Sequence, residues 1–207
     1  MITVVDKKKI NASPIEDNRD NYREYFKEIL PLINHLPGSL VECGFGGGIT
    51  ANIFTDLMID GTIRQRSIHL YDSFEGFPEP SKEDTSKRNP RKGQWARPIE
   101  EAYKVRERAN VPVEVVKGFF EETTKDYSGS AIAILHIDCD LYQSYKTVLE
   151  TLYDKVTPGG LVLFDEYGEG EKWPGAVIAI DEFFKDKNVE FFKFQFPEYG
   201  KYCMIKS

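Results

Sequence analysis

A glycine-rich loop and two groups of carboxylates are the parts of this sequence whose types and spacing could do chemistry. The loop lies between Glu42 and Gly48, directly after a short apolar run. Asp138 and the pair Asp165-Glu166 end two later apolar runs. Glycines let the backbone approach a bulky ligand closely, and carboxylate oxygens are preferred ligands of hard cations. Together they indicate a nucleoside-bearing cofactor beside a divalent cation, a combination suited to methyl transfer onto a hydroxyl group.

The cofactor is not expected to be a dinucleotide. The fingerprint G-x-G-x-x-G would need glycine at a position that holds Ile49 here. A tight strand–helix turn without a ligand remains the alternative, because a glycine loop alone is a weak signal. Asp72 ends the next apolar run, where an acid can accept hydrogen bonds from ribose hydroxyls. It could instead cap the turn at residues 73–76.

The later carboxylates predict a metal site. If the strands that end at Asp138 and Asp165 are neighbours, these carboxylates lie roughly 5 Å apart and repel each other unless something neutralises them. Bound Mg²⁺ would do so, with Glu166 as a further ligand. The alternative is that one carboxylate is protonated and the other caps a helix. Asp140 could be a ligand too, but capping of the helix that starts near Tyr142 is favoured.

The elements that must position these residues alternate along the chain. Strand patterns occur at 39–43, 67–72, 113–117, 131–138 and 161–165, and helical patterns at 18–35, 49–59, 100–108, 144–156 and 175–185. Runs at 190–196 and 202–205, separated by a turn, predict an antiparallel hairpin. The pattern predicts an α/β fold: a doubly wound, Rossmann-like, mostly parallel sheet of seven strands. Ligands of such sheets bind beyond the carboxyl ends of the strands.

Domain organisation follows from the segments that lack such patterns. Residues 1–17 are expected to form a flexible arm, and residues 18–207 a single domain. The segment 73–98 is too long for an ordinary connection and is predicted to be a lid. Trp95 and Trp173 fall in loops at the ligand-binding edge, where they could contact a sugar or simply pack. The basic run 87–92 could be a solvated surface or a contact for a diphosphate group.

Composition limits the classes of function. The net charge of −7 argues against general nucleic-acid binding. Cys43, Cys139 and Cys203 lie in strand-like runs and are interpreted as buried, reduced thiols, as in a cytoplasmic protein. No apolar run approaches the roughly 20 residues of a membrane span. The helix at 18–35 could cover the sheet or bind a second subunit of a homodimer.

The motifs resemble those of the metal-dependent macrocin and mycinamicin sugar O-methyltransferases, a branch of the class I S-adenosylmethionine-dependent methyltransferases. The resemblance covers about residues 40–184. It rests on Val41-Glu42-Cys43-Gly44, Tyr71-Asp72-Ser73-Phe74-Glu75-Gly76-Phe77-Pro78, His136-Ile137-Asp138-Cys139-Asp140-Leu141-Tyr142, Leu152-Tyr153 with Thr157-Pro158-Gly159-Gly160, and Phe164-Asp165-Glu166-Tyr167. The family usually has two aspartates where this chain has Asp165-Glu166, and commonly an arginine where it has His136.

The resemblance implies S-adenosylmethionine and Mg²⁺ as cofactors and a sugar hydroxyl of a glycoside or glycan as the acceptor. It implies cofactor contacts at Glu42, Cys43, Gly44, Phe45, Gly46, Gly47, Thr50, Asp72, Ser73, Gly118, Phe119, Asp138 and Tyr142. It also implies Mg²⁺ ligands at Asp138, Asp165 and Glu166, with Asp138 as the expected base. Two alternatives stay open: methylation of a catechol or other phenol, and a non-catalytic S-adenosylmethionine-binding module.

Overall fold

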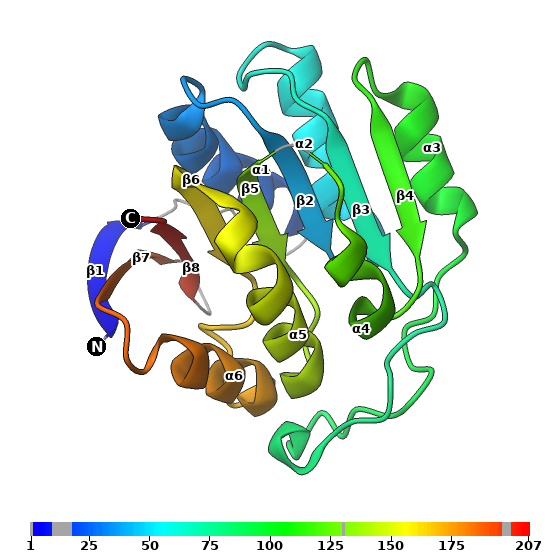
Figure 1. Ribbon diagram of the computed structural model, residues 1–207, viewed down its shortest axis with the longest axis vertical. Coiled ribbons are helices and arrows are strands. Elements are labelled where there is room, and N and C mark those ends of the chain that lie inside the picture. The colour runs from blue at the N-terminus through cyan, green and yellow to red at the C-terminus, as the bar shows by residue number, and fades with distance from the viewer. Residues whose placement is uncertain (1, 10–17, 130, 196–199) are drawn as a thin grey trace.

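The computed structural model describes residues 2–9, 18–129, 131–195 and 200–207. They form an eight-stranded sheet in the order β1-β7-β8-β6-β5-β2-β3-β4 (Figure 1). The strands are β1 Ile2–Lys9, β2 Ser39–Cys43, β3 Ile68–Asp72, β4 Val113–Lys117, β5 Ile132–Ile137, β6 Val156–Phe164, β7 Val189–Gln195 and β8 Gly200–Ile205. β8 pairs antiparallel with β6 and β7, and the other pairs are parallel. The predicted α/β sheet and its final hairpin are confirmed.

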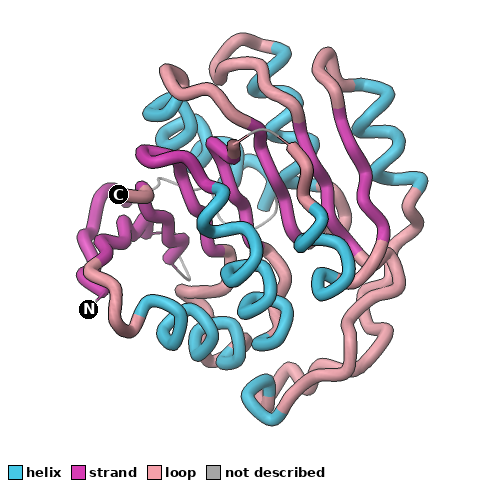
Figure 2. Tube along the Cα trace, viewed as in Figure 1, coloured by secondary structure: helices cyan, strands magenta, loops and turns pink. Residues whose placement is uncertain are grey.

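Helices cover both faces of the sheet (Figures 1 and 2). On one face, α1 Asn18–Ile29, α2 Ile49–Ile59 and α3 Glu100–Arg108 share a core with alternate strand residues such as Leu40 and Leu70. On the other, α4 Phe120–Thr123, α5 Tyr142–Leu152 and α6 Pro174–Phe184 pack on residues such as Val41 and Leu135. Successive residues of a strand point to opposite faces, and because both faces are covered, every residue of β2 and β5 is buried.

The first helix covers the sheet, one of the two roles predicted for it. Its residues Tyr25, Phe26 and Ile29 are buried in the core. The helix ends earlier than predicted, at Ile29, and a 3-10 turn follows over Leu30–Ile33. Pro31 explains the early end, because proline has no N–H to donate and its ring crowds the preceding turn of a helix.

The prediction of a flexible arm is wrong for Ile2–Lys9, which form β1 parallel to β7 and raise the number of strands from the predicted seven to eight. The segment begins with the residues Ile2, Thr3, Val4 and Val5, which favour strands. Its mixed pattern has no clean alternation, and its partner β7 is distant in sequence, since Ile2 pairs with Val189, so local reasoning missed it. The rest of the predicted arm, residues 10–17, lies outside the described residues.

The segment 73–98, called the lid below, is a long loop with one 3-10 turn at Lys82–Asp84. Figure 2 shows it running past the edge of the sheet where the parallel strands end. Two backbone hydrogen bonds join its arms: Phe77 N donates to Gln94 O at 3.0 Å, and Gly93 N donates to Phe77 O at 2.9 Å. The two arms of this segment are therefore tied to each other. Among the described residues, no helix is both long and apolar enough to cross a membrane.

Candidate functional site

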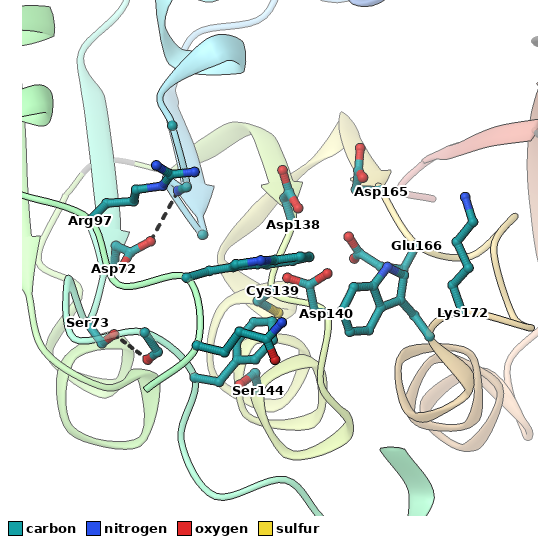
Figure 3. Close-up of a pocket in the computed structure, with 18 of the residues that line it drawn as sticks. Asp72, Ser73, Arg97, Asp138, Cys139, Asp140, Ser144, Asp165, Glu166 and Lys172 are labelled. Carbon is teal, nitrogen blue, oxygen red and sulfur yellow. Dashed lines mark hydrogen bonds between the residues drawn. The ribbon is translucent and has the colours of Figure 1, made fainter. Parts of the chain in front are cut away.

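A cavity of about 640 Å³ lies beyond the carboxyl ends of β2, β3, β5 and β6, under the lid (Figure 3). Its size is typical of sites for small molecules. The predicted site residues that line it are Gly44, Gly46, Gly47, Asp72, Ser73, Asp138, Asp165 and Glu166. One cavity thus joins the glycine loop to the carboxylates of two other strands.

The glycine loop is shaped by close backbone contacts at one end and open space at the other. Gly44 has a φ of +96°, and a Cβ there would overlap the carbonyl oxygen of Asp138. Only glycine fits, and the tips of β2 and β5 come together as a result. At Gly46 and Gly47, by contrast, no atom lies within 4 Å of a Cβ position. The loop therefore presents bare backbone to the cavity.

Asp72 holds this loop in place. Its Oδ2 accepts hydrogen bonds from the backbone N–H groups of Phe45 at 2.8 Å and Gly46 at 3.3 Å. Its Oδ1 accepts one from Phe74 N at 2.6 Å, so the turn-capping role is present. A carboxylate has about four acceptor sites, which leaves room for a ligand hydroxyl. Arg97 of the lid also lines the cavity (Figure 3).

Glu42 supports the loop from below. It is fully buried, and its Oε1 accepts hydrogen bonds from Thr50 Oγ1 and from His136 Nδ1, the latter at 3.1 Å. Burial lowers the pKa of His136, but the hydrogen bond to Glu42 and the negative charges of Glu42, Asp138 and Asp165 together offset this, so the pKa lies above its usual value. This buried pair fixes β2 against β5, and neither residue lines the cavity.

Other predicted cofactor contacts also lie outside the cavity lining. They are Cys43, Phe45, Thr50, Gly118, Phe119 and Tyr142. Phe120, rather than the neighbouring Phe119, lines the cavity. The Tyr142 hydroxyl points elsewhere and donates to Glu182 at 2.7 Å.

The carboxylates form two overlapping groups. Oxygens of Asp138, Asp140 and Glu166 lie within 4.8 Å of one another, and so do ligand atoms of His136, Asp138 and Asp165. The predicted trio of Asp138, Asp165 and Glu166 is not brought together in either group. In Figure 3, the Asp140 and Glu166 side chains turn toward each other below Asp138, while the Asp165 carboxylate is turned away.

The local charge favours binding of a cation. Burial, and then the charge of Asp165, raises the pKa of Asp138 to about 7. Burial, followed by repulsion from the other carboxylates, also raises the pKa of Asp140 and of Glu166 well above their usual values. Burial and mutual repulsion therefore outweigh the positive charges that act on these carboxylates, among them Lys201. Oxygen ligands in this number fit a hard cation such as Mg²⁺, which would neutralise them.

Asp165 has a counter-ion of its own. Lys201 Nζ lies 2.7 Å from Asp165 Oδ1 and donates to the Asp165 backbone oxygen at 2.9 Å. Tyr22 of α1 donates its hydroxyl to the same Oδ1 at 3.0 Å. Burial would raise the pKa of Asp165, but the charges of Lys201 and His136, together with hydrogen bonds from Lys201 and Tyr22, lower it below its usual value. Sequence reasoning missed Lys201 and Tyr22, since neither belongs to a motif.

Asp140 does not cap α5, contrary to the favoured prediction. The backbone N–H of Tyr142 donates instead to Asp84 Oδ1 of the lid, at 2.8 Å. Asp140 itself has a φ of +60°, a left-handed conformation that few non-glycine residues adopt. This conformation carries its side chain into the cavity, which it lines.

An aromatic group forms another part of the cavity wall. The rings of Trp95 and Trp173 are 5.5 Å apart, and Phe77 lies 5.2 Å from Trp95 and 6.0 Å from Trp173. The Arg88 guanidinium lies over both indoles, at 5.7 and 5.2 Å. All of these residues line the cavity. The sequence indicated the two tryptophans and the basic run 87–92 as possible ligand contacts, but it did not indicate that they would lie together.

The chain matches a family model described as Macrocin-O-methyltransferase (TylF) over residues 6–193. Because the match covers most of the sequence, the chain belongs to the macrocin O-methyltransferase family. The resemblance seen in the motifs is confirmed.

Curated relatives are similar over part of their length. The chain is 26% identical over 172 residues to the demethyldecarbamoylnovobiocin O-methyltransferase of Streptomyces niveus, covering 79% of this chain and 64% of that protein. It is 30% identical over 145 residues to the 8-demethyl-8-(2,3-dimethoxy-alpha-L-rhamnosyl)-tetracenomycin-C 4'-O-methyltransferase of Streptomyces olivaceus, covering 66% and 55%. The chain therefore spans less than two thirds of the length of these relatives.

Solved structures of the same fold include an O-methyltransferase and a second methyltransferase. The O-methyltransferase NovP has a TM-score of 0.74 and 26% identity, covering 89% of this chain and 79% of that chain. The calicheamicin methyltransferase CalS11 has a TM-score of 0.77 and 22% identity, covering 95% and 88%. The first likeness agrees with the family, and the second concerns the fold alone.

Proposed function

We propose that the protein is an S-adenosylmethionine-dependent, Mg²⁺-dependent O-methyltransferase that acts on a sugar hydroxyl of a glycoside or glycan. One observation carries the proposal: a single cavity joins the glycine loop and Asp72 to carboxylates at the ends of β5 and β6. Family membership supports the methyl transfer. The name of the Streptomyces olivaceus relative includes a rhamnosyl group, which supports a sugar as the methyl acceptor.

The glycine loop and Asp72 bind the cofactor in this proposal. Gly46 and Gly47 leave room for the methionine end, because no side chain fills the space above them. Asp72, already fixed by three backbone N–H groups, accepts a hydrogen bond from the ribose. Phe120 lies at the end where the adenine is expected, in place of the predicted Phe119.

The carboxylates prepare the acceptor oxygen. The pKa of a sugar hydroxyl is far too high for ionisation near neutrality, and bound Mg²⁺ would supply Lewis-acid activation and orientation of neighbouring hydroxyls. Asp138 and Glu166 are the ligands on which the proposal depends most, because they belong to the same group of carboxylates. Asp138 also receives the proton as the oxygen attacks the methyl group.

The aromatic wall binds the acceptor and excludes water. Trp95 comes from the lid and Trp173 from the residue before α6, so an acceptor between them and the carboxylates contacts both. Indole rings suit the apolar faces of sugars. The three buried free cysteines support the further expectation of a reducing, cytoplasmic location.

The test is a methyl-transfer assay with labelled S-adenosylmethionine on a panel of glycosides, sugar nucleotides and catechols. We expect methylated sugars, loss of turnover with excess chelator, and loss of turnover in Asp138→Asn with binding of S-adenosylhomocysteine retained. Transfer to catechols but to no sugar would favour the phenolic alternative. Full activity of Asp138→Asn would contradict the proposed base.

A further inference from the structure

We propose that the acceptor carries an oxyanion, a phosphate or a carboxylate, next to the sugar that is methylated, and that Arg88 of the lid binds this group. The inference rests on the proposed function, because it takes the ligand of this part of the cavity to be the acceptor. It narrows that acceptor from sugars in general to anionic sugars, such as sugar phosphates, sugar nucleotides and uronides.

Two aromatic rings hold Arg88 at the cavity. Its guanidinium carbon lies 5.2 Å from the ring centre of Trp173 and 5.7 Å from that of Trp95, and both distances are within the range of a cation–π contact. Trp173 is only 6% exposed, so the core fixes one of the two rings. Although the Arg88 side chain is exposed, it is therefore part of the cavity wall.

The N–H edge of this guanidinium is available to a ligand. Within the described residues, Arg88 forms a hydrogen bond only through its backbone N–H, which donates to Ser86 Oγ at 3.2 Å, and its side chain has no ion pair. Contact with aromatic rings uses the face of the guanidinium plane and leaves the donors at its edge. Two of these donors match the two oxygens of a carboxylate or phosphate group.

The other basic side chains of the described cavity lining are placed differently. Lys172 Nζ donates to Glu169 Oε2 at 2.7 Å, so a carboxylate already neutralises it. Arg97 also lines a second cavity of about 430 Å³, together with Gly47 of the glycine loop, and so lies toward the cofactor end. Arg88 is the one that lies with the two tryptophans assigned to the acceptor.

An alternative role for Arg88 is to neutralise a carboxylate of the site. Its positive charge does act to lower the pKa of Asp140, against the larger effect of burial. In the part of the chain that the structure describes, however, no ion pair joins the two side chains. Asp140 therefore leaves the donors of Arg88 unused, and the positive charge of Arg88 reaches the side of the cavity where the acceptor hydroxyl must lie.

The test compares neutral and anionic ligands that share a sugar. Calorimetry measures the binding of methyl glucoside, methyl glucuronide and glucose 1-phosphate to the full chain, saturated with S-adenosylhomocysteine and Mg²⁺, and the galactose series repeats the comparison. In at least one series, we expect wild type to bind an anionic ligand about tenfold more tightly than the neutral one, because hydrogen bonds to charged groups are the strong ones. Preference for the uronide or for the phosphate identifies the source of the oxyanion.

Substitutions in the lid assign this preference to one side chain. Arg88→Gln should reduce it to less than about threefold, and Arg88→Lys should lie between, because lysine keeps the charge but not the planar fork. Arg91→Gln is the matched control, since Arg91 is an exposed arginine of the same lid that does not line the cavity. Thermal melting checks that each variant is folded. A preference retained in Arg88→Gln, or no preference of wild type in either series, would overturn the inference.

The inference and the proposed function can fail separately. If binding of anionic sugars depends on Arg88 but no labelled methyl group reaches any sugar, the proposed function is wrong and the anion site stands. If wild type and Arg88→Gln methylate neutral glycosides as efficiently as anionic ones, the inference is wrong and the proposed function stands.

Discussion

The Asp84 carboxylate of the lid caps helix α5 by accepting a hydrogen bond from the backbone N–H of Tyr142 at 2.8 Å. Asp84 is 4% exposed, and its other oxygen accepts hydrogen bonds from Ser81 N at 2.8 Å and Ser81 Oγ at 3.0 Å. It also packs against Gly175 at the start of α6, where a Cβ would overlap it. One buried side chain therefore ties the lid to both helices beside the carboxylate site.

Replacing Asp84 should loosen the lid more than the cofactor site. Asp84→Ala removes the cap, which typically contributes about 1 kcal/mol, and frees the loop that carries Arg88 and Trp95. We expect a lower unfolding free energy in urea and a raised KM for the acceptor, with little change in S-adenosylhomocysteine affinity by calorimetry. Asp84→Asn is the intermediate variant: its carbonyl oxygen can still accept from Tyr142, but its NH2 group cannot accept from Ser81, so only the cap is kept. An acceptor KM equal to that of wild type in Asp84→Ala would contradict a role for this tie in acceptor binding.

Two glycines of the same loop should respond in opposite ways. At Gly47, φ is not positive and no atom lies within 4 Å of a Cβ position, so Gly47→Ala should fold with near wild-type stability. The added methyl group enters the space assigned to the cofactor, and we expect weaker cofactor binding. Gly44→Ala has no room against Asp138 and a φ of +96°, and should be strongly destabilised. Thermal melting and calorimetry separate the two effects. Unchanged cofactor affinity in Gly47→Ala would place the cofactor elsewhere.

The sequence predicted the parts of the site that lie on strands with clear patterns. The carboxyl ends of β2, β3, β5 and β6 meet at one edge because parallel strands must, so Gly44, Asp72, Asp138 and Asp165 gather there as predicted. This conclusion needs only strand order and direction. The sequence could not indicate on which side of the strand end each side chain points.

The missed features depend on contacts between distant segments. Lys201 reaches Asp165 because β8 lies beside β6, and no local pattern distinguishes this lysine from a solvated one in a turn. Asp140 was interpreted as a cap because it precedes a helix, but a residue of the lid, Asp84, took that position. Competition of this kind between a local and a distant partner is decided by tertiary packing, which is visible only in the structure.

Replacing Trp95 should weaken binding of the acceptor with little change in the stability of the protein. It is 44% exposed and has a φ of +65°, which is unfavourable for a bulky residue. Trp95→Gly removes this strain, worth about 1–2 kcal/mol, but loses the ring contacts with Phe77 and Trp173, so we expect only a small net change in urea unfolding. It also removes half of the indole pair, so the KM for a glycoside should rise several-fold. Trp95→Phe is the control that keeps an aromatic ring. An unchanged KM for the glycoside in Trp95→Gly would show that Trp95 does not contact the acceptor.

Cys139 should report on occupancy of the cavity through its reactivity. Among the three cysteines, it is the one that lines the cavity, and burial, followed by the nearby charge of Glu166, raises its pKa well above the usual value. Because the thiolate is the reactive form, alkylation by iodoacetamide should be slow at pH 7 and rise about tenfold per pH unit while the pH stays below the pKa. Bound S-adenosylhomocysteine should slow the alkylation of Cys139 further by covering the thiol.

Mass spectrometry of peptides after short labelling measures each cysteine separately, with Cys203 as the internal control, since it lies outside the cavity. Rapid labelling of Cys139 at pH 7 in the folded protein would show that its thiol is neither buried nor shifted as the structure describes.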